Sequence, residues 1–441
     1  MKLSGWGRTP VIDAQMNAPR DIDALQKLVA GAKTVIARGN GRAYGDSAIN
    51  PSGTVEMRHL NRMLAFDPET GLLTAEAGLI LGDIISAFLP RGWFPAVTPG
   101  TKFVTLGGMI AADVHGKNHH KDGSFRECVH WIDILDSGGM IRRCSRTEHA
   151  ELFEHTLGGM GLTGIVLRAA ISLRPVESGW IRQTTHPAPN LKTAMEIFEQ
   201  SGDATYSVAW IDCLGTGQNL GRSLVMLGEH AGLTDLPVGR ARQPFDIPGK
   251  RPLSIPFDMP AFLLNPLTVR AFNALYYRAG ERQTGERLVD WDSYFYPLDA
   301  IQQWNRLYGR KGFAQFQCVL PLERSEQGLT RLLEATSGIG AGSFLAVLKR
   351  FGEQESAFSF PMAGYTLALD FPVNRRTLAL MDELDQITLD HGGRFYLAKD
   401  SRMKAETLHK ADPRAQDFKQ TRDARSWSDR FQSSQAERLS L

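Results

Sequence analysis

The spacing of apolar residues predicts helices and short strands that alternate over the first 175 residues. Ile22, Leu25 and Val29 fall on one face of a helical pattern. Asp21 just before them is a suitable N-cap, so we expect a helix over residues 21–32. The same reasoning gives the other elements of this part: strands at 34–38, 73–77, 129–135, 140–143 and 165–173, and helices at 81–89 and 150–157. The third and fourth strands flank a turn and predict a hairpin, and the whole order indicates an α+β domain, not a regular doubly wound sheet.

The pattern changes after about residue 175, where longer segments alternate between inward and outward positions. Residues 206–212 and 313–320 are two such segments, and they predict strands of a separate antiparallel sheet. Between them, residues 237–266 are rich in proline and mix basic with apolar side chains without a regular period. We expect a mobile loop or a lid here. An ordinary loop and a segment that touches an amphiphilic ligand or a membrane surface both stay open.

The composition is that of a globular protein, and it excludes some classes of function. A net charge of +2 over 441 residues gives no reason to expect a nucleic-acid partner. No signal peptide is recognisable, and no apolar run reaches the roughly 18 residues of a membrane span. We expect a cytoplasmic protein; a peripheral position at the inner membrane, the periplasmic face included, stays open. The cysteines lack zinc-site spacing and are expected to be reduced, partly buried thiols: Cys128, Cys144, Cys213 and Cys318.

The first of three glycine-rich segments, residues 39–47, follows a predicted strand. Its glycines allow several backbone N–H groups to converge on one anion, and a pyrophosphate is the obvious target. The spacing is not that of the GxGxxG fingerprint, because Tyr44 stands where the third glycine belongs. A Rossmann-type site is therefore not indicated.

The other two glycine segments give weaker signals. Gly107-Gly108 precedes small residues typical of a helix start, which predicts a second anion site at a helix N-terminus. Gly159, Gly161 and Gly164 do match GxGxxG, but a predicted helix precedes them and a predicted strand follows. The dinucleotide fingerprint requires the reverse order. A tight helix-to-strand turn is the alternative interpretation.

Two histidines have the spacing of metal ligands. His115 and His119 are four residues apart, which on a helix would suit a metal ion. Gly116 argues against a helix, no third ligand is evident, and the glutamate of an HExxH motif is missing. We expect no metal site. A serine hydrolase is not indicated either, because no GxSxG motif occurs.

The three glycine segments, in this order, resemble the FAD-binding domain of the vanillyl-alcohol-oxidase-like superfamily. In that superfamily the first glycine loop surrounds the pyrophosphate, and the second and third line the rest of the cofactor. Covalent members bind the flavin through a histidine of the first loop. Arg42 stands at that position here, so the resemblance implies a non-covalent, dissociable FAD. Arg42 would pair with a phosphate instead.

Four strings resemble one branch more closely, the decaprenylphosphoryl-β-D-ribose 2′-oxidase family: GWGRT at 5–9, RAYGD at 42–46, HGKNHH at 115–120 and YLAKDSR at 396–402. HGKNHH and AKDSR are specific, whereas the glycine loops alone are not. The resemblance runs nearly the full length and implies a two-domain α+β FAD-binding fold. We expect an FAD-binding domain at 1–175 and a substrate-binding domain on an antiparallel sheet at 176–394. Residues 395–441 would return to the FAD-binding domain.

The resemblance implies oxidation of the 2-hydroxyl of a polyprenyl-phosphoryl pentose, ribose, to the 2-keto sugar. FAD would accept the hydride, and a short-chain reductase partner would then reduce the ketone to the arabinose epimer. Two other functions stay open: an FAD-dependent soluble sugar or alditol oxidase, and a non-catalytic flavin- or nucleotide-binding subunit. The electron acceptor, oxygen or quinone, stays open as well.

The resemblance also implies a set of site residues. Lys399 and His115 are the expected catalytic residues, since alcohol oxidation needs a group that takes the hydroxyl proton. A lysine base would need its pKa lowered by burial, and as an ammonium it would stabilise the reduced flavin. The expected substrate contacts are Lys117, Trp210, Gln315, Gln317, Lys349 and Lys399. The expected FAD contacts are Arg38, Gly39, Asn40, Gly41, Arg42, Ala43, Tyr44, Pro99, Gly100, Thr101, Thr105, Gly107, Gly108, Ala111, His115, Gly116, Asn118, His119, Gly161, Gly164, Ile165 and Tyr396.

Core packing is an alternative role for Trp210. In the segment 364–370, Ala368 and Thr366 occupy the positions of a pocket cysteine and a nearby asparagine of the actinobacterial enzymes. Nitroaromatic inhibitors that trap that cysteine should not bond covalently to Ala368. The exchange leaves the exact sugar and lipid open.

Overall fold

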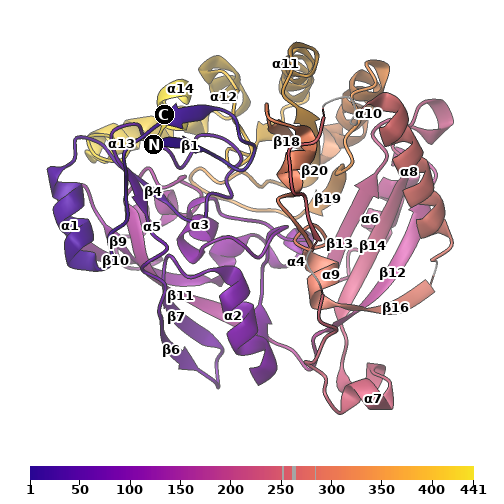
Figure 1. Ribbon diagram of the computed structural model, residues 1–441, viewed down its shortest axis with the longest axis horizontal. Coiled ribbons are helices and arrows are strands. Elements are labelled where there is room, and N and C mark those ends of the chain that lie inside the picture. The colour runs from indigo at the N-terminus through magenta and orange to yellow at the C-terminus, as the bar shows by residue number, and fades with distance from the viewer. Residues whose placement is uncertain (251–252, 261–264, 284) are drawn as a thin grey trace.

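The computed structural model describes residues 1–250, 253–260, 265–283 and 285–441 (Figure 1). Its first part is built on an antiparallel sheet in the order β10-β9-β11-β7-β6, with β8 paired to β11. The strands are β6 (Met63–Asp67), β7 (Leu72–Glu76), β8 (Trp93–Pro95), β9 (Val129–Leu135), β10 (Ile141–Ser145) and β11 (Ile165–Pro175). Helices α2 (Leu81–Phe88), α3 (Leu106–Ala111) and α5 (Ala150–Thr156) contribute side chains to the same core. Beside this sheet lies a small parallel sheet of β3 (Met16–Asn17), β5 (Thr54–Glu56) and β4 (Ile36–Arg38), together with helix α1 (Ile22–Gly31).

The second part is an eight-stranded antiparallel sheet in the order β16-β12-β14-β13-β19-β20-β18-β21. The strands are β12 (Trp180–Ala188), β13 (Tyr206–Ile211), β14 (Ser223–His230), β16 (Gly285–Asp290), β18 (Phe313–Pro321), β19 (Val347–Phe351), β20 (Gly364–Pro372) and β21 (Arg394–Phe395). Helices α6 (Leu191–Gln200), α10 (Leu322–Gly338) and α11 (Arg375–Asp390) cover one face and share its apolar core. Helix α8 (Pro266–Glu281) packs against β12 and β14 (Figure 1).

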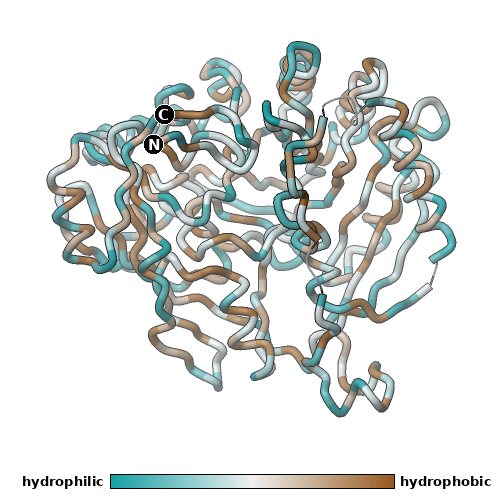
Figure 2. The backbone as a smooth tube through the Cα atoms, viewed as in Figure 1, coloured by the Kyte–Doolittle hydropathy of each residue, from teal (hydrophilic) through white to brown (hydrophobic). Residues whose placement is uncertain are grey.

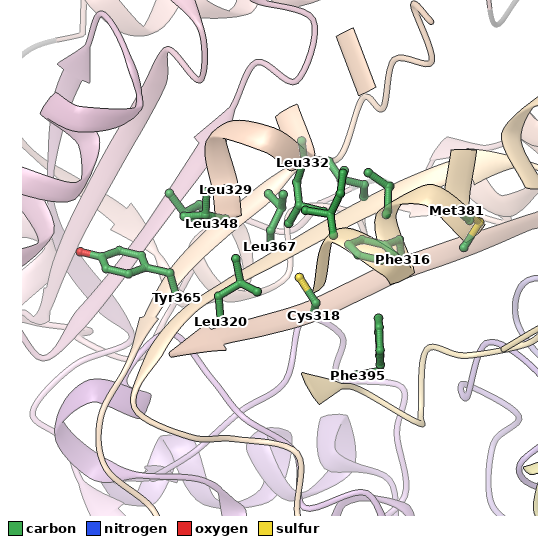
Figure 3. Packing of buried hydrophobic residues seen from close by; sticks show 14 of the residues in the cluster. Phe316, Cys318, Leu320, Leu329, Leu332, Leu348, Tyr365, Leu367, Met381 and Phe395 are labelled. Carbon is green, nitrogen blue, oxygen red and sulfur yellow. The ribbon is translucent and has the colours of Figure 1, made fainter. Parts of the chain in front are cut away.

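Strand β18 shows which side chains the sequence places on each face of this sheet. Phe316, Cys318 and Leu320 point into the core beneath α10 and α11, among Leu332 and Met381 (Figure 3). Successive side chains of a strand point to opposite faces, so the odd-numbered residues of β18 turn away from these helices. Gln315 and Gln317 therefore lie on the face that the helices leave free. Figure 2 shows the hydropathy of each residue along the chain, with many hydrophilic residues on the outer helices at the top of the view.

The last part of the chain returns to the first part. Helices α12 (Ala405–Ala411), α13 (Arg414–Ala424) and α14 (Ser434–Leu439) lie near the N-terminus (Figure 1). Val35 donates from its N–H to the carbonyl of Arg430 at 2.8 Å, and Ser434 donates to the carbonyl of Ile49 at 2.8 Å. These contacts fix the C-terminal helices against the strand that leads into the first glycine loop.

Most elements expected from the sequence are present. Asp21 caps α1 by accepting from the N–H of Ala24 at 2.7 Å, and β9 and β10 form the expected hairpin. The four cysteines are free and buried. No helix among the described residues is long and apolar enough to cross a membrane.

The expected loop at 237–266 lies partly outside the described residues. Its described part contains the short helix α7 (Val238–Ala241) and the strand β15 (Leu253–Ser254), which pairs with β17 (Ile301–Gln302). Asp258 forms an ion pair with Arg8 at 2.5 Å. This segment therefore contacts the N-terminal part of the chain at Arg8.

Candidate active site

A cavity of about 550 Å³ lies between the glycine-rich loops and the free face of the eight-stranded sheet. Its size falls in the range of roughly 300–1,000 Å³ that small-molecule and cofactor sites occupy. Most residues expected at the site line it: Gly39, Asn40, Gly41, Arg42, Ala43, Tyr44, Pro99, Gly100, Thr101, Thr105, Gly107, Gly108, Ala111, His115, Gly116, Lys117, Gly161, Gly164, Trp210, Gln315, Gln317, Lys349, Tyr396 and Lys399. The fold thus brings together segments that are far apart in the sequence.

The loop after β4 presents backbone N–H groups to the cavity. Residues 39–43 line it, and none of their N–H groups donates to an acceptor among the described residues. Gly41 adopts a φ of +62°, and a Cβ there would lie 2.6 Å from the guanidinium of Arg38. A Cβ at Gly39 would clash with Oγ1 of Thr105. Glycine is needed at both positions, and this row of unpaired donors fits the pyrophosphate of a dinucleotide.

Arg42 projects from the same loop and lies over aromatic rings. Its guanidinium carbon is 4.1 Å from the ring centre of Trp6 and 5.1 Å from that of Phe103. Burial lowers the pKa of Arg42, and the nearby Asp299 opposes this effect. The Nε of Arg42 is buried and has no hydrogen-bond partner among the described residues. Arg42 is thus a cation on the cavity wall with an unused donor.

The structure contradicts the anion site expected at the second glycine segment. Helix α3 is a short helix that Thr105 caps, and its first N–H groups are already paired. Leu106 donates to Leu79 at 2.8 Å, Gly107 donates to Ala77 at 2.7 Å, and Gly108 donates to Thr105 Oγ1. The predicted anion site at this helix N-terminus is therefore wrong, although Gly107 and Gly108 do line the cavity.

The third glycine segment is a tight turn between α5 and β11. Gly161 and Gly164 line the cavity with φ values of +78° and +157°. A Cβ at Gly164 would lie 2.8 Å from the carbonyl of Leu135. The glycines here therefore allow close packing of the turn against β9, in agreement with the alternative interpretation of the GxGxxG match.

His115 lies deep in the cavity wall among aromatic rings, 4.8 Å from Phe351 and 5.0 Å from Tyr396 between ring centres. Burial lowers its pKa well below the ordinary value, and electrostatic interactions with Lys349, His119 and Lys399 lower it further. The Nε2 of Gln317 donates to the Nε2 of His115 at 3.1 Å. The imidazole is therefore neutral, and its proton lies on Nδ1.

Two half-buried lysines, Lys117 and Lys349, line the cavity. Burial, and to a smaller extent the charge of Lys349, lowers the pKa of Lys117 to about 7. Burial lowers the pKa of Lys349 to about 8. Lys117 donates to the backbone carbonyl of Tyr294 and lies 4.0 Å from the centre of that ring. Lys349 forms no ion pair with a described residue. Two cations without a partner carboxylate make this region a suitable place for an anion.

Lys399 faces the same cavity from the C-terminal segment. Its Nζ lies 3.8 Å from the ring centre of Tyr44, which belongs to the first glycine loop. Burial lowers the pKa of Lys399, and Asp370 opposes this shift. Burial also raises the pKa of Asp370, whose Oδ1 accepts from Nε2 of Gln315 and whose Oδ2 has no partner among the described residues.

Asp400, the neighbour of Lys399, is tied to the end of the chain. Arg438 of α14 donates to Asp400 at 2.8 Å and to Asp46 at 2.7 Å. Gln435 donates to the carbonyl of Leu397 at 2.8 Å. The C-terminal helix therefore holds the Lys399 segment against the first glycine loop.

Four expected cofactor contacts do not line the cavity: Arg38, Asn118, His119 and Ile165. Arg38 donates to the carbonyl of Ser4 at 2.8 Å, and Asn118 donates to that of Ala96 at 2.8 Å. His119 contacts Gln354 at 2.9 Å, and Ile165 is buried in a separate core. No group of His, Cys, Asp or Glu side chains suited to a metal ion occurs in the described part of the chain.

The sequence reasoning missed two carboxylates on the cavity wall. Asp370 lies on the same face of β20 as Thr366 and Ala368, and all three line the cavity. The alternation of side chains along β20 could have indicated that Asp370 faces the cavity. Asp299 accepts from Oγ1 of Thr101 at 2.8 Å, and no local pattern marks it. Trp210 is both a buried residue and a cavity residue, since it lines the wall and is 7% exposed.

Comparisons with known proteins agree with this geometry. The family model of an FAD binding domain matches residues 14–145. A decaprenylphosphoryl-β-D-ribose oxidase of Mycolicibacterium smegmatis is 36% identical over 450 residues, covering 100% of this chain and 97% of the relative. An L-gulonolactone oxidase of Bos taurus is 27% identical over 43% of each chain. A cytokinin dehydrogenase of Oryza sativa is 30% identical over 41% of this chain and 37% of its own.

The shorter matches are confined to part of the chain, whereas the first covers all of it. Together with the FAD binding domain they establish FAD as the cofactor. The unpaired N–H groups of residues 39–43 are an independent fit to this molecule. The chain belongs to the decaprenylphosphoryl-β-D-ribose oxidase family and is an FAD-dependent oxidoreductase.

Proposed function

We propose that this protein oxidises the 2-hydroxyl of a polyprenyl-phosphoryl pentose, ribose, to the 2-keto sugar. This step would be the first half of an epimerisation to the arabinose form. One observation carries the proposal: the same cavity is lined by the unpaired N–H groups of residues 39–43, three half-buried lysines and two strand amides. A dinucleotide, a phosphate diester and a sugar are the ligands that these groups suit. The relative from M. smegmatis is named for such a substrate.

We assign proton removal to Lys399. Its lowered pKa leaves part of the side chain as a neutral amine near neutral pH, and a neutral amine accepts the hydroxyl proton. Asp370 then stabilises the ammonium that forms, since its charge raises the pKa of Lys399. When bound, FAD supplies the acceptor for the hydride of the carbinol carbon.

His115 has a different role in this proposal. Its ring is neutral, and Gln317 occupies its Nε2, so Nδ1–H is the group available as a donor. A neutral donor can orient a hydroxyl or a flavin oxygen without exchanging a proton. We therefore propose that His115 orients the reactants and that Lys399 moves the proton.

We propose that Lys349 and Lys117 bind the phosphate of the substrate, and that Gln315 and Gln317 contact the sugar. The two cations lie in the cavity wall without a carboxylate partner among the described residues. Both amides come from the cavity face of β18. Ala368 lies on the adjacent strand β20 in register with Gln317, and its small side chain leaves more room for the sugar than a cysteine would.

We further propose that the FAD is bound without a covalent bond, because Arg42 stands at the position of the tethering histidine. A guanidinium does not form the histidyl bond. The same proposal places an FAD-binding domain at 1–175, a substrate-binding domain at 176–394 and a returning segment at 395–441, in a vanillyl-alcohol-oxidase-like fold. Two separate sheets and the bridge between Val35, just before β4, and Phe431 of the C-terminal segment support this division.

Two partners follow from the chemistry of this proposal. The 2-keto product requires a reductase to complete an epimerisation, and a short-chain reductase is the proposed partner. A polyprenyl substrate is held in a membrane, so we propose peripheral contact of the protein with the inner membrane. A non-catalytic subunit is not supported, because the chain is an FAD-dependent oxidoreductase.

The experiment is anaerobic reduction of the FAD-loaded protein by a panel of candidate substrates, followed as bleaching of the flavin absorbance. We expect bleaching by a short-chain isoprenyl-phosphoryl ribose and none by free ribose, free alditols or an isoprenyl phosphate without sugar. Equal bleaching by free ribose or by an alditol would overturn the proposal in favour of a soluble sugar or alditol oxidase. Product analysis by mass spectrometry, after borodeuteride reduction, checks that the oxidised carbon is C2.

A further inference from the structure

Helix α8 has an apolar outer surface. Val269, Asn273, Tyr277 and Gly280 are buried and face the sheet, as the spacing of an amphipathic helix requires. The side turned away from the sheet would ordinarily be polar. Instead it presents a stripe of apolar side chains, which we call the α8 stripe: Leu267, Ala271, Phe272, Leu275, Tyr276 and Ala279. Leu267 is 76% exposed and Leu275 is 68% exposed.

A neighbouring helix of the same sheet, α10, has a polar exposed face instead. The exposed positions of α10 include Glu323, Glu326 and Arg331, which is the usual pattern of a solvated helix face. Isolated exposed leucines are common on proteins, whereas a contiguous apolar surface marks a binding face. The α8 stripe is contiguous because its members recur at intervals of three, four or five residues.

The α8 stripe continues into the cavity. Phe272 and Tyr276 are each 41% exposed, and both also line the cavity wall. The ring of Tyr276 lies 4.8 Å from that of Trp210, and the ring of Phe272 lies 5.2 Å from that of Phe344. Trp210 and Phe344 line the cavity as well. An apolar surface therefore runs without interruption from the outside of α8 to the substrate cavity.

Basic residues flank the stripe. Arg270 and Arg278 are exposed on α8, and Arg282 follows at its end; none of them forms an ion pair with a carboxylate among the described residues. Glu281 is the only acidic residue of the helix. An apolar stripe bordered by unpaired arginines is the arrangement of helices that lie in the interface of an anionic bilayer.

We propose that the α8 stripe is the surface by which this protein docks on an anionic lipid bilayer. Leu267 and Leu275 enter the head-group region, and the arginines contact lipid phosphates. Docking in this orientation brings the aromatic end of the cavity to the bilayer surface, so a lipid-linked substrate reaches the cavity without leaving the membrane. The delivery of a lipid-linked substrate to the cavity rests on the proposed function, whereas the docking itself does not.

A bilayer explains the surface better than a second protein does. The stripe is joined to a cavity that accepts a small molecule, and a protein partner docked over it would close that opening. Charge complementarity points the same way, because the free arginines attract any anionic bilayer by a long-range force that salt screens.

The test is co-sedimentation of the full-length, FAD-loaded protein with vesicles of phosphatidylcholine alone or mixed with phosphatidylglycerol. We expect binding to the mixed vesicles, weakened by salt. The double substitution Leu267→Glu/Leu275→Glu should weaken it by more than about tenfold, because it removes apolar area and adds negative charge. Leu64→Glu is the matched control, since Leu64 is 42% exposed on β6, away from α8 (Figure 1). Equal binding of the double variant and the wild-type protein would overturn the proposal, as would a wild-type protein that does not sediment.

Two further measurements separate this proposal from its alternatives. Light scattering measures the mass of the wild-type protein and of the double variant. If the substitutions change this mass and leave vesicle binding unchanged, the stripe is a contact between two copies and the proposal fails. Flavin bleaching by a short, water-soluble isoprenyl-phosphoryl ribose should be equal in the wild-type protein and the double variant, whereas bleaching by a long-chain substrate in vesicles should be slower in the variant. Vesicle binding without bleaching by any lipid-linked ribose would reject the proposed function and leave the docking surface standing.

Discussion

Gln317 donates from its Nε2 to the Nε2 of His115 at 3.1 Å, although the two residues are 202 positions apart in the chain. The bond fixes the proton of the imidazole on Nδ1, and burial keeps the ring neutral by lowering its pKa well below the ordinary value. One strand amide thus sets both the tautomer and the orientation of the histidine that faces the cavity.

Replacement of the Gln317 amide by a carboxylate should reverse the donor and acceptor in the hydrogen bond to His115. In Gln317→Glu, the carboxylate accepts a proton from Nε2 and raises the pKa of His115. We expect flavin reduction by the substrate to become about 10- to 100-fold slower at neutral pH, with a changed pH profile. Single-turnover stopped-flow absorbance measures this rate. Gln183→Glu, at a buried position of β12 in the same sheet, controls for burial of a new carboxylate. An unaltered pH profile in Gln317→Glu would contradict the role given to the pair.

Lys399→Ala should abolish proton removal and leave a folded protein that still binds FAD. Loss of a general base typically costs 10²- to 10⁴-fold in rate, and we expect a loss of about that size in single-turnover flavin reduction. The absorbance spectrum of the bound flavin and circular dichroism confirm cofactor binding and folding. Lys404→Ala, at an exposed position nearby, is the control. Near-normal flavin reduction in Lys399→Ala would refute the assignment.

Phosphate binding should weaken as the pH rises. Burial lowers the pKa of Lys117 to about 7 and that of Lys349 to about 8, so each ammonium is lost above those values. A bound phosphate favours the charged forms, so binding takes up protons and the affinity is highest below about pH 7. Titration calorimetry with an isoprenyl phosphate should show roughly a tenfold increase in Kd between pH 7 and pH 9.

The same measurement on Lys349→Met tests which lysine is responsible. We expect weaker binding at pH 7 and a flatter dependence on pH, because one of the two titrating groups is removed. Lys192→Met, at an exposed position of α6, should behave as the wild-type protein. An affinity that rises with pH would be incompatible with phosphate binding by these lysines.

Gly41→Val should reduce the affinity for FAD. Gly41 has a φ of +62°, which valine rarely adopts, and a Cβ there meets the guanidinium of Arg38 at 2.6 Å, so valine strains the loop that presents the free N–H groups. We expect an affinity at least about tenfold lower, measured by quenching of flavin fluorescence on titration of the apoprotein. Gly139→Val introduces the same backbone strain at a φ of +81° in open space, in the turn between β9 and β10, which does not line the cavity. If both variants lose FAD equally, the effect is general destabilisation.

Denaturation should release the flavin completely. We propose that Arg42 stands at the position of the tethering histidine, and its guanidinium lies over Trp6. Acid precipitation of the yellow protein should leave all of the flavin in the supernatant. Flavin that stays on the polypeptide through electrophoresis in detergent would show that another residue forms a bond.

Local patterns predicted those features that depend on periodicity. The alternation of β18 correctly separated Gln315 and Gln317 from Phe316, because a strand has a strict period of two whatever lies around it. The N-cap of α1 and the β9–β10 hairpin were predictable for the same reason: the signal lies within a few residues. The roles of the individual site residues stay predictions.

Features that depend on distant segments were not predictable in this way. The N-terminus of α3 was expected to bind an anion, but the carbonyls of Ala77 and Leu79 already accept from its N–H groups. Only the folded chain brings those carbonyls there. Asp299 contacts Thr101 across about 200 residues, and nothing near either residue indicates it. The apolar and basic signal was assigned to residues 237–266, part of which lies outside the described residues, and nothing in that pattern pointed to the exposed apolar residues of α8 just beyond them.

The bonds from Arg438 to Asp46 and Asp400 have a consequence for the order in which the enzyme becomes active during its synthesis. A ribosome makes the first glycine loop early and Arg438 near the end of the described chain. The nascent chain can form its first sheet and begin to enclose the dinucleotide while Lys399 still lacks the anchor that holds its segment in place. With Lys399 in its proposed role, we expect oxidising activity to begin only after α14 has joined its segment to the cofactor loop, and a chain without α14 to be inactive.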